Sequence, residues 1–169
     1  MYSAGILPYT IFNNNIFFLI GQEKSDKTWS DFGGHSKKKD NNYSLKTAFR
    51  EFLEETNNCI PISFDYFETS PKMTIISKTM KSNPYYMYIM YIDNRYVDIH
   101  KFLNNVRKTN HLVYNEKINI MWVSFKRLKN IVSNFGEDSC IRLRSVFYKT
   151  LLCNLESLNA LRVTSINEK

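Results

Sequence analysis

The sequence predicts a mixed α/β (α+β) fold, in which a mixed β-sheet is flanked by helices. Three segments carry this prediction. Residues 3–12 and 16–22 are rich in β-branched and aromatic residues and are separated by asparagines, a pattern typical of a β-hairpin. Residues 43–56 place apolar side chains at three- and four-residue steps, which indicates an amphipathic helix. Residues 85–92 are apolar or aromatic on both faces, as in a central strand covered on both sides.

The other elements follow in chain order. After the hairpin comes a polar loop with Trp29, and then Gly33 and Gly34, which allow a sharp turn or a close approach to a ligand. The helix over 43–56 ends at the pair Asn57-Asn58, because asparagine accepts the left-handed conformation of a helix terminus. The remaining predicted elements are strands at about 63–69, 73–79 and 118–123, and helices at about 98–108, 125–133 and 138–161.

Length and composition agree with a single packed domain. The chain has 169 residues, of which 43% are hydrophobic and 23% are charged. These fractions are those of ordinary globular proteins and exclude a disordered or collagen-like chain. At this length roughly 68–70% of the unfolded chain's surface is buried on folding. We therefore expect one domain over residues 1–169.

Charge, hydropathy and cysteine content limit which binding partners and which cellular compartment are expected for the protein. The chain has 23 Lys and Arg against 16 Asp and Glu, a formal charge of +7, which suits a polyanionic partner. The apolar run over residues 16–20 is far shorter than the roughly 20 residues that span a bilayer, and no signal-peptide pattern is present. We expect a cytoplasmic protein without membrane contact. Cys59, Cys140 and Cys153 lack the spacing of a disulfide framework or zinc site, so we expect three buried thiols.

Residues 50–55 hold the pattern that carries chemistry. On a helix, Glu51 lies three and four residues from Glu54 and Glu55, so the three carboxylates share one face. A hard cation such as Mg²⁺ or Mn²⁺, which prefers oxygen ligands, would relieve their repulsion. A solvated helix face with incidental ion pairs is the alternative interpretation. The glycine pair and polar loop just upstream favour the metal site.

Together these features resemble the signature of the Nudix hydrolase family. That signature runs from a glycine through a spaced glutamate to Arg-Glu-hydrophobic-x-Glu-Glu-x-Gly-hydrophobic. This chain shows Gly33-Gly34 and then Arg50-Glu51-Phe52-Leu53-Glu54-Glu55-Thr56-Asn57. The N-terminal hairpin and residues 116–128, with their tryptophan, extend the resemblance. It implies a Nudix-type α/β/α sandwich with a core over about 1–130 and an additional C-terminal helical extension over about 138–165.

The chain departs from the signature in the loop. The distance from glycine to arginine is two residues longer, and the spaced glutamate has no clear counterpart, so either Asp40 replaces it or Arg50 has another partner. Asn57 stands where the signature has its last glycine, a replacement that a left-handed position tolerates. The departures indicate either a diverged loop around intact ligands or a fold that has lost catalysis.

The resemblance implies a magnesium-dependent hydrolase, with Mn²⁺ as the second candidate cofactor. Arg50 then orients Glu51 through a charge-assisted hydrogen bond, and Glu116 is either a further base or ligand or an exposed loop residue. We expect Glu54→Gln and Glu55→Gln each to abolish turnover. The implied catalytic residues are Glu54, Glu51, Arg50 and Glu116, and the implied metal ligands are Glu51, Glu54, Glu55 and the carbonyl of Gly34.

Candidate substrate-binding residues surround the glycine pair. The three lysines among them either meet a polyphosphate or RNA backbone or form a solvated insertion. The histidine is a candidate phosphate contact. The two aromatic residues either line a nucleobase pocket or pack in the core. These candidates are Trp29, Phe32, His35, Lys37, Lys38 and Lys39.

The reaction that the resemblance implies is cleavage of a diphosphate linkage in a nucleoside diphosphate-X substrate, by attack of water on phosphorus. Two alternatives stay open. One is an mRNA-decapping or diphosphoinositol-polyphosphate hydrolase, and the other is a catalytically impaired module that binds a nucleotide or a protein. The partner is accordingly a phosphorylated small molecule or capped RNA. The apolar stripe of residues 138–161 covers the chain's own sheet or a second subunit, so the chain is a monomer or a homodimer.

Overall fold

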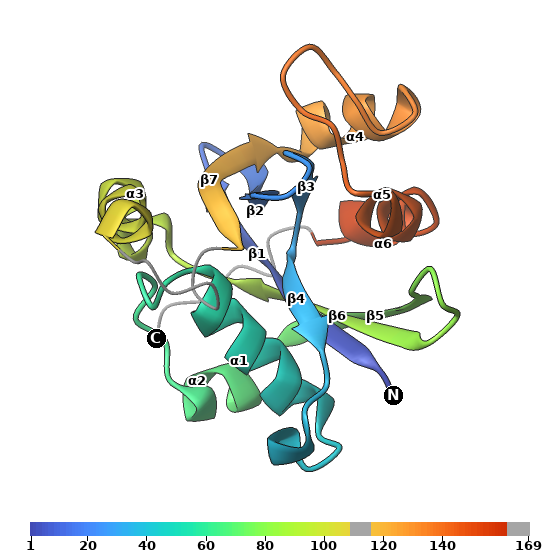
Figure 1. Ribbon diagram of the computed structural model, residues 1–169. Helices are drawn as coiled ribbons and strands as arrows, with labels where there is room; N and C mark the ends of the chain where they lie inside the picture. The colour runs from blue at the N-terminus through green and yellow to red at the C-terminus, as the bar shows by residue number, and fades with distance from the viewer. Residues whose placement is uncertain (109–115, 162–169) are drawn as a thin grey trace.

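The computed structural model describes residues 1–108 and 116–161 and is built around one mixed sheet (Figure 1). The strand order is β3-β2-β1-β6-β5, with β4 also paired to β1 and β7 to β2. β1 and β6 run parallel, and the other named pairs are antiparallel. The strands are β1 (Ser3–Phe12), β2 (Asn15–Glu23), β3 (Trp29–Ser30), β4 (Phe32–His35), β5 (Lys72–Lys78), β6 (Pro84–Tyr91) and β7 (Lys117–Ser124).

Helices cover both faces of the sheet. Figure 1 shows α1, α2 and α3 on one side and α4, α5 and α6 on the other. Each group packs on its own cluster of buried apolar side chains. The predicted α/β/α sandwich with a mixed sheet is therefore confirmed. The α-helices are α1 (Ser44–Glu55), α2 (Phe64–Thr69), α3 (Ile99–Lys108), α4 (Phe125–Ser133), α5 (Ser145–Leu152) and α6 (Leu155–Asn159), with short 3-10 helices η1 (Lys38–Asp40) and η2 (Asn94–Tyr96).

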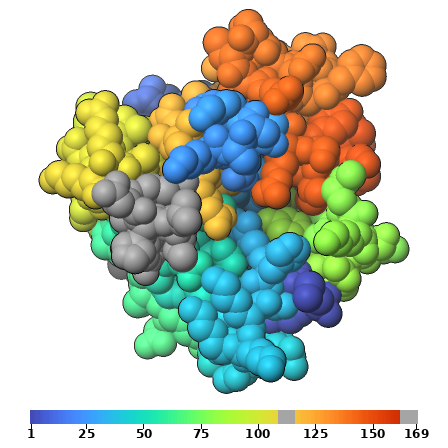
Figure 2. Space-filling model, in the orientation of Figure 1, coloured from blue at the N-terminus to red at the C-terminus, as the bar shows by residue number. Residues whose placement is uncertain are grey.

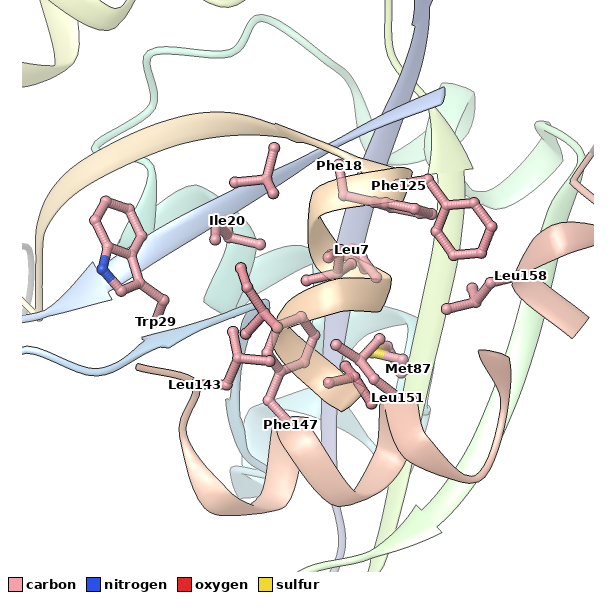
Figure 3. Close-up of a cluster of buried hydrophobic side chains, with 14 of the residues drawn as sticks. Leu7, Phe18, Ile20, Trp29, Met87, Phe125, Leu143, Phe147, Leu151 and Leu158 are labelled. Carbon is pink, nitrogen blue, oxygen red and sulfur yellow. The ribbon is translucent and has the colours of Figure 1, made fainter. Parts of the chain in front are cut away.

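Alternation along the strands divides the core between the two faces. Ala4 and Ile6 pack on the α1 side, while Leu7 of the same strand packs on the side of α4 and α5. β6 does the same with Met87 and Met90, which are both fully buried on opposite faces. Figure 3 shows Leu7 and Met87 together in the cluster on the side of α4 and α5. The prediction of a central strand covered on both sides is confirmed.

Asparagines shape the two local features that the sequence marks most clearly. In the hairpin, Asn13 and Asn14 have φ of 47° and 59°, the left-handed values that a tight turn between twisted strands requires. At the end of α1, Asn57 and Asn58 both have φ of 52°. The hairpin, the helix and its termination are as predicted.

The structure contradicts one predicted strand and one predicted loop. The strand expected over residues 63–69 is instead helix α2 (Phe64–Thr69), because the Ser63 side chain accepts the Tyr66 N–H as the N-cap and Phe67 packs into the core beneath α1. Trp29, expected in a polar loop, lies in β3, which pairs with Gly21 and Gln22 of β2.

The long helix expected over residues 138–161 is also wrong, because the sheet edge competes for its first residues. Leu143 pairs in parallel with Trp29 of β3, and the Trp29 N–H donates to the Arg142 carbonyl at 2.8 Å. The Arg144 N–H donates back to the Trp29 carbonyl at 2.9 Å. Only after this extended stretch do α5 and α6 begin. Together with Leu143, the apolar side chains of these helices cover the chain's own sheet, where Figure 3 shows Phe147, Leu151 and Leu158.

The structure also tests the expected burial of the cysteines and shows the length of the helices. Cys59 is buried as expected, whereas Cys140 and Cys153 are exposed, so the prediction of three buried thiols is wrong for these two. Both exposed cysteines lie in the C-terminal region that was expected to be one continuous helix. Within residues 1–108 and 116–161, no helix has the length and apolar character needed to cross a membrane.

Candidate active site

The glycine pair lies in β4 and permits two close approaches within the chain, whereas the sequence left open a sharp turn or a close approach to a ligand. Gly33 faces Gly5 of β1, and a Cβ on Gly33 would lie 2.6 Å from the Gly5 Cα. A Cβ on Gly34 would lie 2.6 to 2.8 Å from the carboxylate atoms of Glu51. Glycine at position 34 therefore makes the room in which α1 brings the Glu51 carboxylate against the strand.

Arg50 ties the loop after β4 to the carboxylates of α1. Its Nε and Nη2 donate to the two Asp40 oxygens at 3.0 and 2.9 Å. Nη1 donates to Glu51 Oε1 at 2.6 Å and to Glu54 Oε2 at 3.2 Å, and Nη2 also donates to the His35 carbonyl at 2.9 Å. The planar guanidinium suits such forked binding. One side chain thus holds three carboxylates and the end of β4 in fixed relative positions.

Asp40 is the partner that the lengthened loop supplies for Arg50. It is 3% exposed and accepts hydrogen bonds from the Lys37 N–H at 2.8 Å and from Thr47 Oγ1 at 2.9 Å. Burial raises the pKa of Asp40, but the hydrogen bonds from Arg50, Lys37 and Thr47 outweigh it and bring the pKa down to about 2. Of the two alternatives that the sequence left open, the structure shows the pairing of Asp40 with Arg50.

Asp40→Asn is expected to make the protein less stable at neutral pH by about 2 kcal/mol, the value of the pKa depression of Asp40. Because the folded-state pKa lies below the usual 3.8, this stabilisation is present above about pH 4 and is lost as the pH falls toward 2. Urea unfolding of both proteins from pH 7 to pH 2.5 measures it. A stability difference that stays constant over this range would contradict the role given to the Asp40 charge.

The three glutamates of α1 do not share one environment. Glu51 and Glu54 line a cleft, whereas Glu55 is 2% exposed and turned toward the sheet, where its Oε2 accepts the Gly33 N–H at 2.7 Å. Burial raises the pKa of Glu51, and Arg50 acts against this. Burial also raises the pKa of Glu55 well above its usual value, and Lys117 opposes it. The helix therefore presents two of its three carboxylates to the cleft.

The cleft has a volume of about 510 Å³ and collects basic side chains from distant segments. Besides α1, its lining includes β4 and the loop after it, the β5–β6 hairpin and the start of α5. Figure 2 shows these segments on one side of the molecule in cyan, green and orange. Acidic and basic side chains together in one cleft suit a phosphorylated ligand with a divalent ion. The basic side chains are His35, Lys37, Lys81 and Arg144.

The predicted substrate-binding residues divide between the cleft and other places. His35 and Lys37 line the cleft, and Lys37 Nζ lies 3.3 Å from Glu54 Oε2. Lys38 and Lys39 lie exposed on η1, with Lys39 Nζ 3.9 Å from the other Glu54 oxygen. The lysines of the loop are therefore divided between contact with the cleft glutamate and solvent.

The two aromatic candidates pack in the core. Trp29 is 3% exposed in the cluster beneath α4 and α5, and Phe32 is fully buried beneath α1, where its ring meets Phe52 edge to face at 5.5 Å. Neither is among the residues that line the cleft. Of their two interpretations, the structure places them in the packing role.

Glu116 lines the cleft, next to residues that the sequence did not assign to the site. Among these, the Tyr85 hydroxyl donates to the Asp31 carboxylate, and burial raises the pKa of Asp31 to about 6 against this hydrogen bond. Asp31 lies two residues before the glycine pair, which is the one sequence signal that could have drawn attention to it. Lys81 and Arg144 carry no local signal, because they reach the cleft through strand pairing and helix packing.

Two carboxylates of the cleft fit a divalent ion that keeps much of its water. Among residues 1–108 and 116–161, no three His, Cys, Asp or Glu side chains are grouped closely enough to form a metal cage. Mg²⁺ commonly binds through one or two carboxylates together with waters and substrate phosphates. Glu51 and Glu54 supply such a pair, and the space at Gly34 lets the backbone of β4 reach Glu51. Glu55 does not fit, because it is engaged in the interior.

The arrangement of sheet and helices is that of the Nudix fold. The structure is similar to that of an Ap4A hydrolase from Caenorhabditis elegans, with a TM-score of 0.53 and 18% identity over 94% of this chain and 96% of the other. It is also similar to the Nudix domain of Shewanella oneidensis NrtR in complex with ADP-ribose, with a TM-score of 0.55 and 10% identity over 94% and 88%. A MutT protein from Methanosarcina mazei gives a TM-score of 0.52 and 15% identity over 94% of each chain.

Sequence comparisons add one short match. No family model matches the chain. An uncharacterised protein of Acanthamoeba polyphaga mimivirus is 46% identical over 63 residues, which cover 32% of this chain and 19% of that protein. The chain therefore spans about a fifth of the length of this relative. The fold that the signature implies is confirmed by the solved structures, and the activity is a matter for proposal.

Proposed function

We propose that the chain is a divalent-metal-dependent Nudix-type pyrophosphohydrolase that cleaves a diphosphate linkage in a nucleoside diphosphate-X substrate. The observation that carries this proposal is the pair of carboxylates Glu51 and Glu54, held by Arg50 at a cleft that four basic side chains also line. A cleft of about 510 Å³ has the size of a small-molecule site. The structural neighbours include an Ap4A hydrolase and a domain solved with ADP-ribose, which supports a nucleotide with linked phosphates.

Each cleft residue has a separate task in this proposal. Arg50 keeps Glu51 and Glu54 side by side, and these carboxylates would hold a divalent ion together with the Gly34 carbonyl. Such an ion would supply charge neutralisation for the diphosphate and would lower the pKa of the attacking water. Lys37 and Arg144 bind phosphate oxygens. These contacts place the diphosphate beside the two carboxylates.

The reaction forms one bond and breaks another. The water oxygen bonds to one phosphorus as the bridging P–O bond breaks, and the leaving phosphate departs as an anion stabilised by the basic side chains. The proton of the attacking water passes to a cleft carboxylate. Glu116 is our candidate for this proton acceptor, because Arg50 already engages both Glu51 and Glu54.

A non-catalytic binding module is the second candidate function, and the burial of Glu55 favours it. The Nudix signature implies a third carboxylate ligand, and here that carboxylate faces the interior. A module of this kind would bind the same phosphorylated ligands in the cleft without turning them over.

A substrate panel separates these functions. The wild-type protein is incubated with dinucleoside polyphosphates, ADP-ribose, nucleoside triphosphates, a diphosphoinositol polyphosphate and capped RNA, each with Mg²⁺, Mn²⁺ or EDTA, and the released phosphates are identified. We expect metal-dependent cleavage of a nucleoside diphosphate-X compound. Cleavage confined to capped RNA and weakening steeply with salt would assign decapping. Ligand binding with no turnover on the whole panel would assign the binding module.

Gly34→Ala and Gly33→Ala form a matched pair that tests whether Gly34 makes the room for the Glu51 carboxylate. The alanine at position 34 meets the end of the flexible Glu51 side chain, so we expect a loss of hydrolysis of about tenfold or more with little loss of stability. The alanine at position 33 meets the backbone of β1, so we expect a loss of about 1–3 kcal/mol in the free energy of unfolding. Urea unfolding and the hydrolysis assay measure both. Full activity in Gly34→Ala would refute this account of the glycine.

A further inference from the structure

A lysine ammonium lies in the interior beside Glu55, on the helix that also carries the two cleft carboxylates. Lys117, at the start of β7, is 1% exposed. Its Nζ lies 2.6 Å from Glu23 Oε1, 2.6 Å from Ser30 Oγ and 3.5 Å from Glu55 Oε1. These four residues, which we call the Lys117 cluster, come from β7, β2, β3 and α1. The ammonium therefore connects the helix that carries the Nudix signature to the sheet behind it.

The surroundings are built to admit this lysine. Gly21 of β2 leaves room for its stem, because a Cβ there would lie 3.0 Å from Lys117 Cδ. The Phe32 ring lies beside the ammonium, with its centroid 5.9 Å from Nζ. A buried ammonium costs much free energy unless carboxylates and hydrogen bonds compensate it. The Lys117 cluster supplies two carboxylates and a hydroxyl.

Glu55 has both of its oxygens engaged away from the cleft. Oε2 accepts the Gly33 N–H at 2.7 Å, and Oε1 lies 3.5 Å from Lys117 Nζ. Neither Glu55 nor Lys117 is among the residues that line the cleft. The carboxylate that the family resemblance would assign to a divalent ion already has a cation, which the chain itself provides.

We propose that the ammonium of Lys117 takes the place of a divalent ion at Glu55, so that metal binding in this chain depends on Glu51 and Glu54. Glu55 is then a positioning residue, which holds Gly33 and with it the strand under Glu51. The part of this proposal that concerns metal binding rests on the proposed function. The pairing of Lys117 with Glu55 can be tested without it.

The pairing is tested by a double-mutant cycle in urea unfolding. Lys117→Met and Glu55→Gln are compared with the double variant, and Glu23 keeps Arg144, 3.0 Å away, as a partner in each. We expect each single variant to lower the unfolding midpoint, and the double variant to lose less than the sum of the two losses. Additive losses would overturn the pairing.

Metal binding is tested by counting bound Mn²⁺ through the electron paramagnetic resonance signal of free Mn²⁺. We expect Glu55→Gln to keep the wild-type dissociation constant within about twofold, while the matched variant Glu54→Gln raises it about tenfold or more. An equal loss in the two variants would overturn the proposal. This measurement needs no Lys117 variant, so it decides the matter even if Lys117→Met does not fold.

The two proposals fail in different ways. If the wild-type protein binds no Mn²⁺ and cleaves no substrate of the panel, the proposed function is wrong, and the cycle alone decides the pairing of Lys117 with Glu55. If the wild-type protein is active but needs Glu55 for Mn²⁺, the proposed function stands and the present inference is wrong.

Discussion

Glu54→Gln is expected to lower kcat/KM for metal-dependent diphosphate cleavage at least about a hundredfold, the size of effect seen when one electrostatic group of an active site is removed. The substitution keeps the shape of the side chain and removes its charge at the cleft. Lys37 is about half exposed in its ion pair with Glu54, so that pair contributes little to stability, and Arg50 keeps Asp40 and Glu51 as partners. We therefore expect the free energy of unfolding to stay within about 1 kcal/mol of wild type.

The matched control for this variant is Glu156→Gln. Glu156 is an exposed residue of α6 outside the cleft lining, so its substitution removes the same charge without touching the site. Initial rates on the best substrate of the panel, with Mg²⁺ and with EDTA, give the comparison. Near-normal hydrolysis by Glu54→Gln would remove Glu54 from the catalytic set and with it the main support for the proposed enzyme.

Arg50→Met is expected to lower the free energy of unfolding by about 3–5 kcal/mol, because it leaves buried carboxylates without their cation. Asp40 and Glu51 are 3% and 7% exposed, so water cannot easily replace the guanidinium. Activity should be lost as well, since Glu51 and Glu54 are no longer held together. Urea unfolding at pH 7 measures the stability, and circular dichroism shows whether the fold is retained.

Arg50→Lys separates the charge of Arg50 from its shape. A lysine restores a positive charge but cannot donate in a planar fork to Asp40 and Glu51 at once. We expect stability between that of Arg50→Met and wild type, with hydrolysis still reduced. If Arg50→Met proved as stable as wild type, the guanidinium would have no structural role.

Local chemistry explains why much of the fold could be predicted. The Asn13-Asn14 turn and the periodicity of α1 are encoded within a few neighbouring residues, and helix geometry alone brings Arg50, Glu51 and Glu54 together. The strand prediction for residues 63–69 was wrong because an aromatic-rich segment suits a strand as well as a capped helix. The helix prediction for residues 142–144 was wrong because their extended form depends on Trp29, a partner far away in the chain.

The site shows the same division between local and distant information. Asp40 was one of two alternatives for the partner of Arg50, and only the folded loop decides between them. Lys117 gave no signal, because a lysine at the start of a strand is usually solvated, and its burial depends on Glu23, Ser30 and Glu55 meeting in space. A helical face of three glutamates could not reveal that one of them turns inward.

The backbone pairing of residues 142–144 with Trp29 divides two roles along the chain. It ties the C-terminal segment to the sheet edge and so brings Arg144 to the cleft, whereas Glu51 and Glu54 lie on α1, on the opposite side of the sheet from α5 and α6. Under the proposed function, Arg144 acts in ligand binding and the two carboxylates act in the reaction. We therefore expect exchange of the C-terminal segment to change which ligand the cleft accepts more than the chemistry, so that protein engineering can vary the two separately.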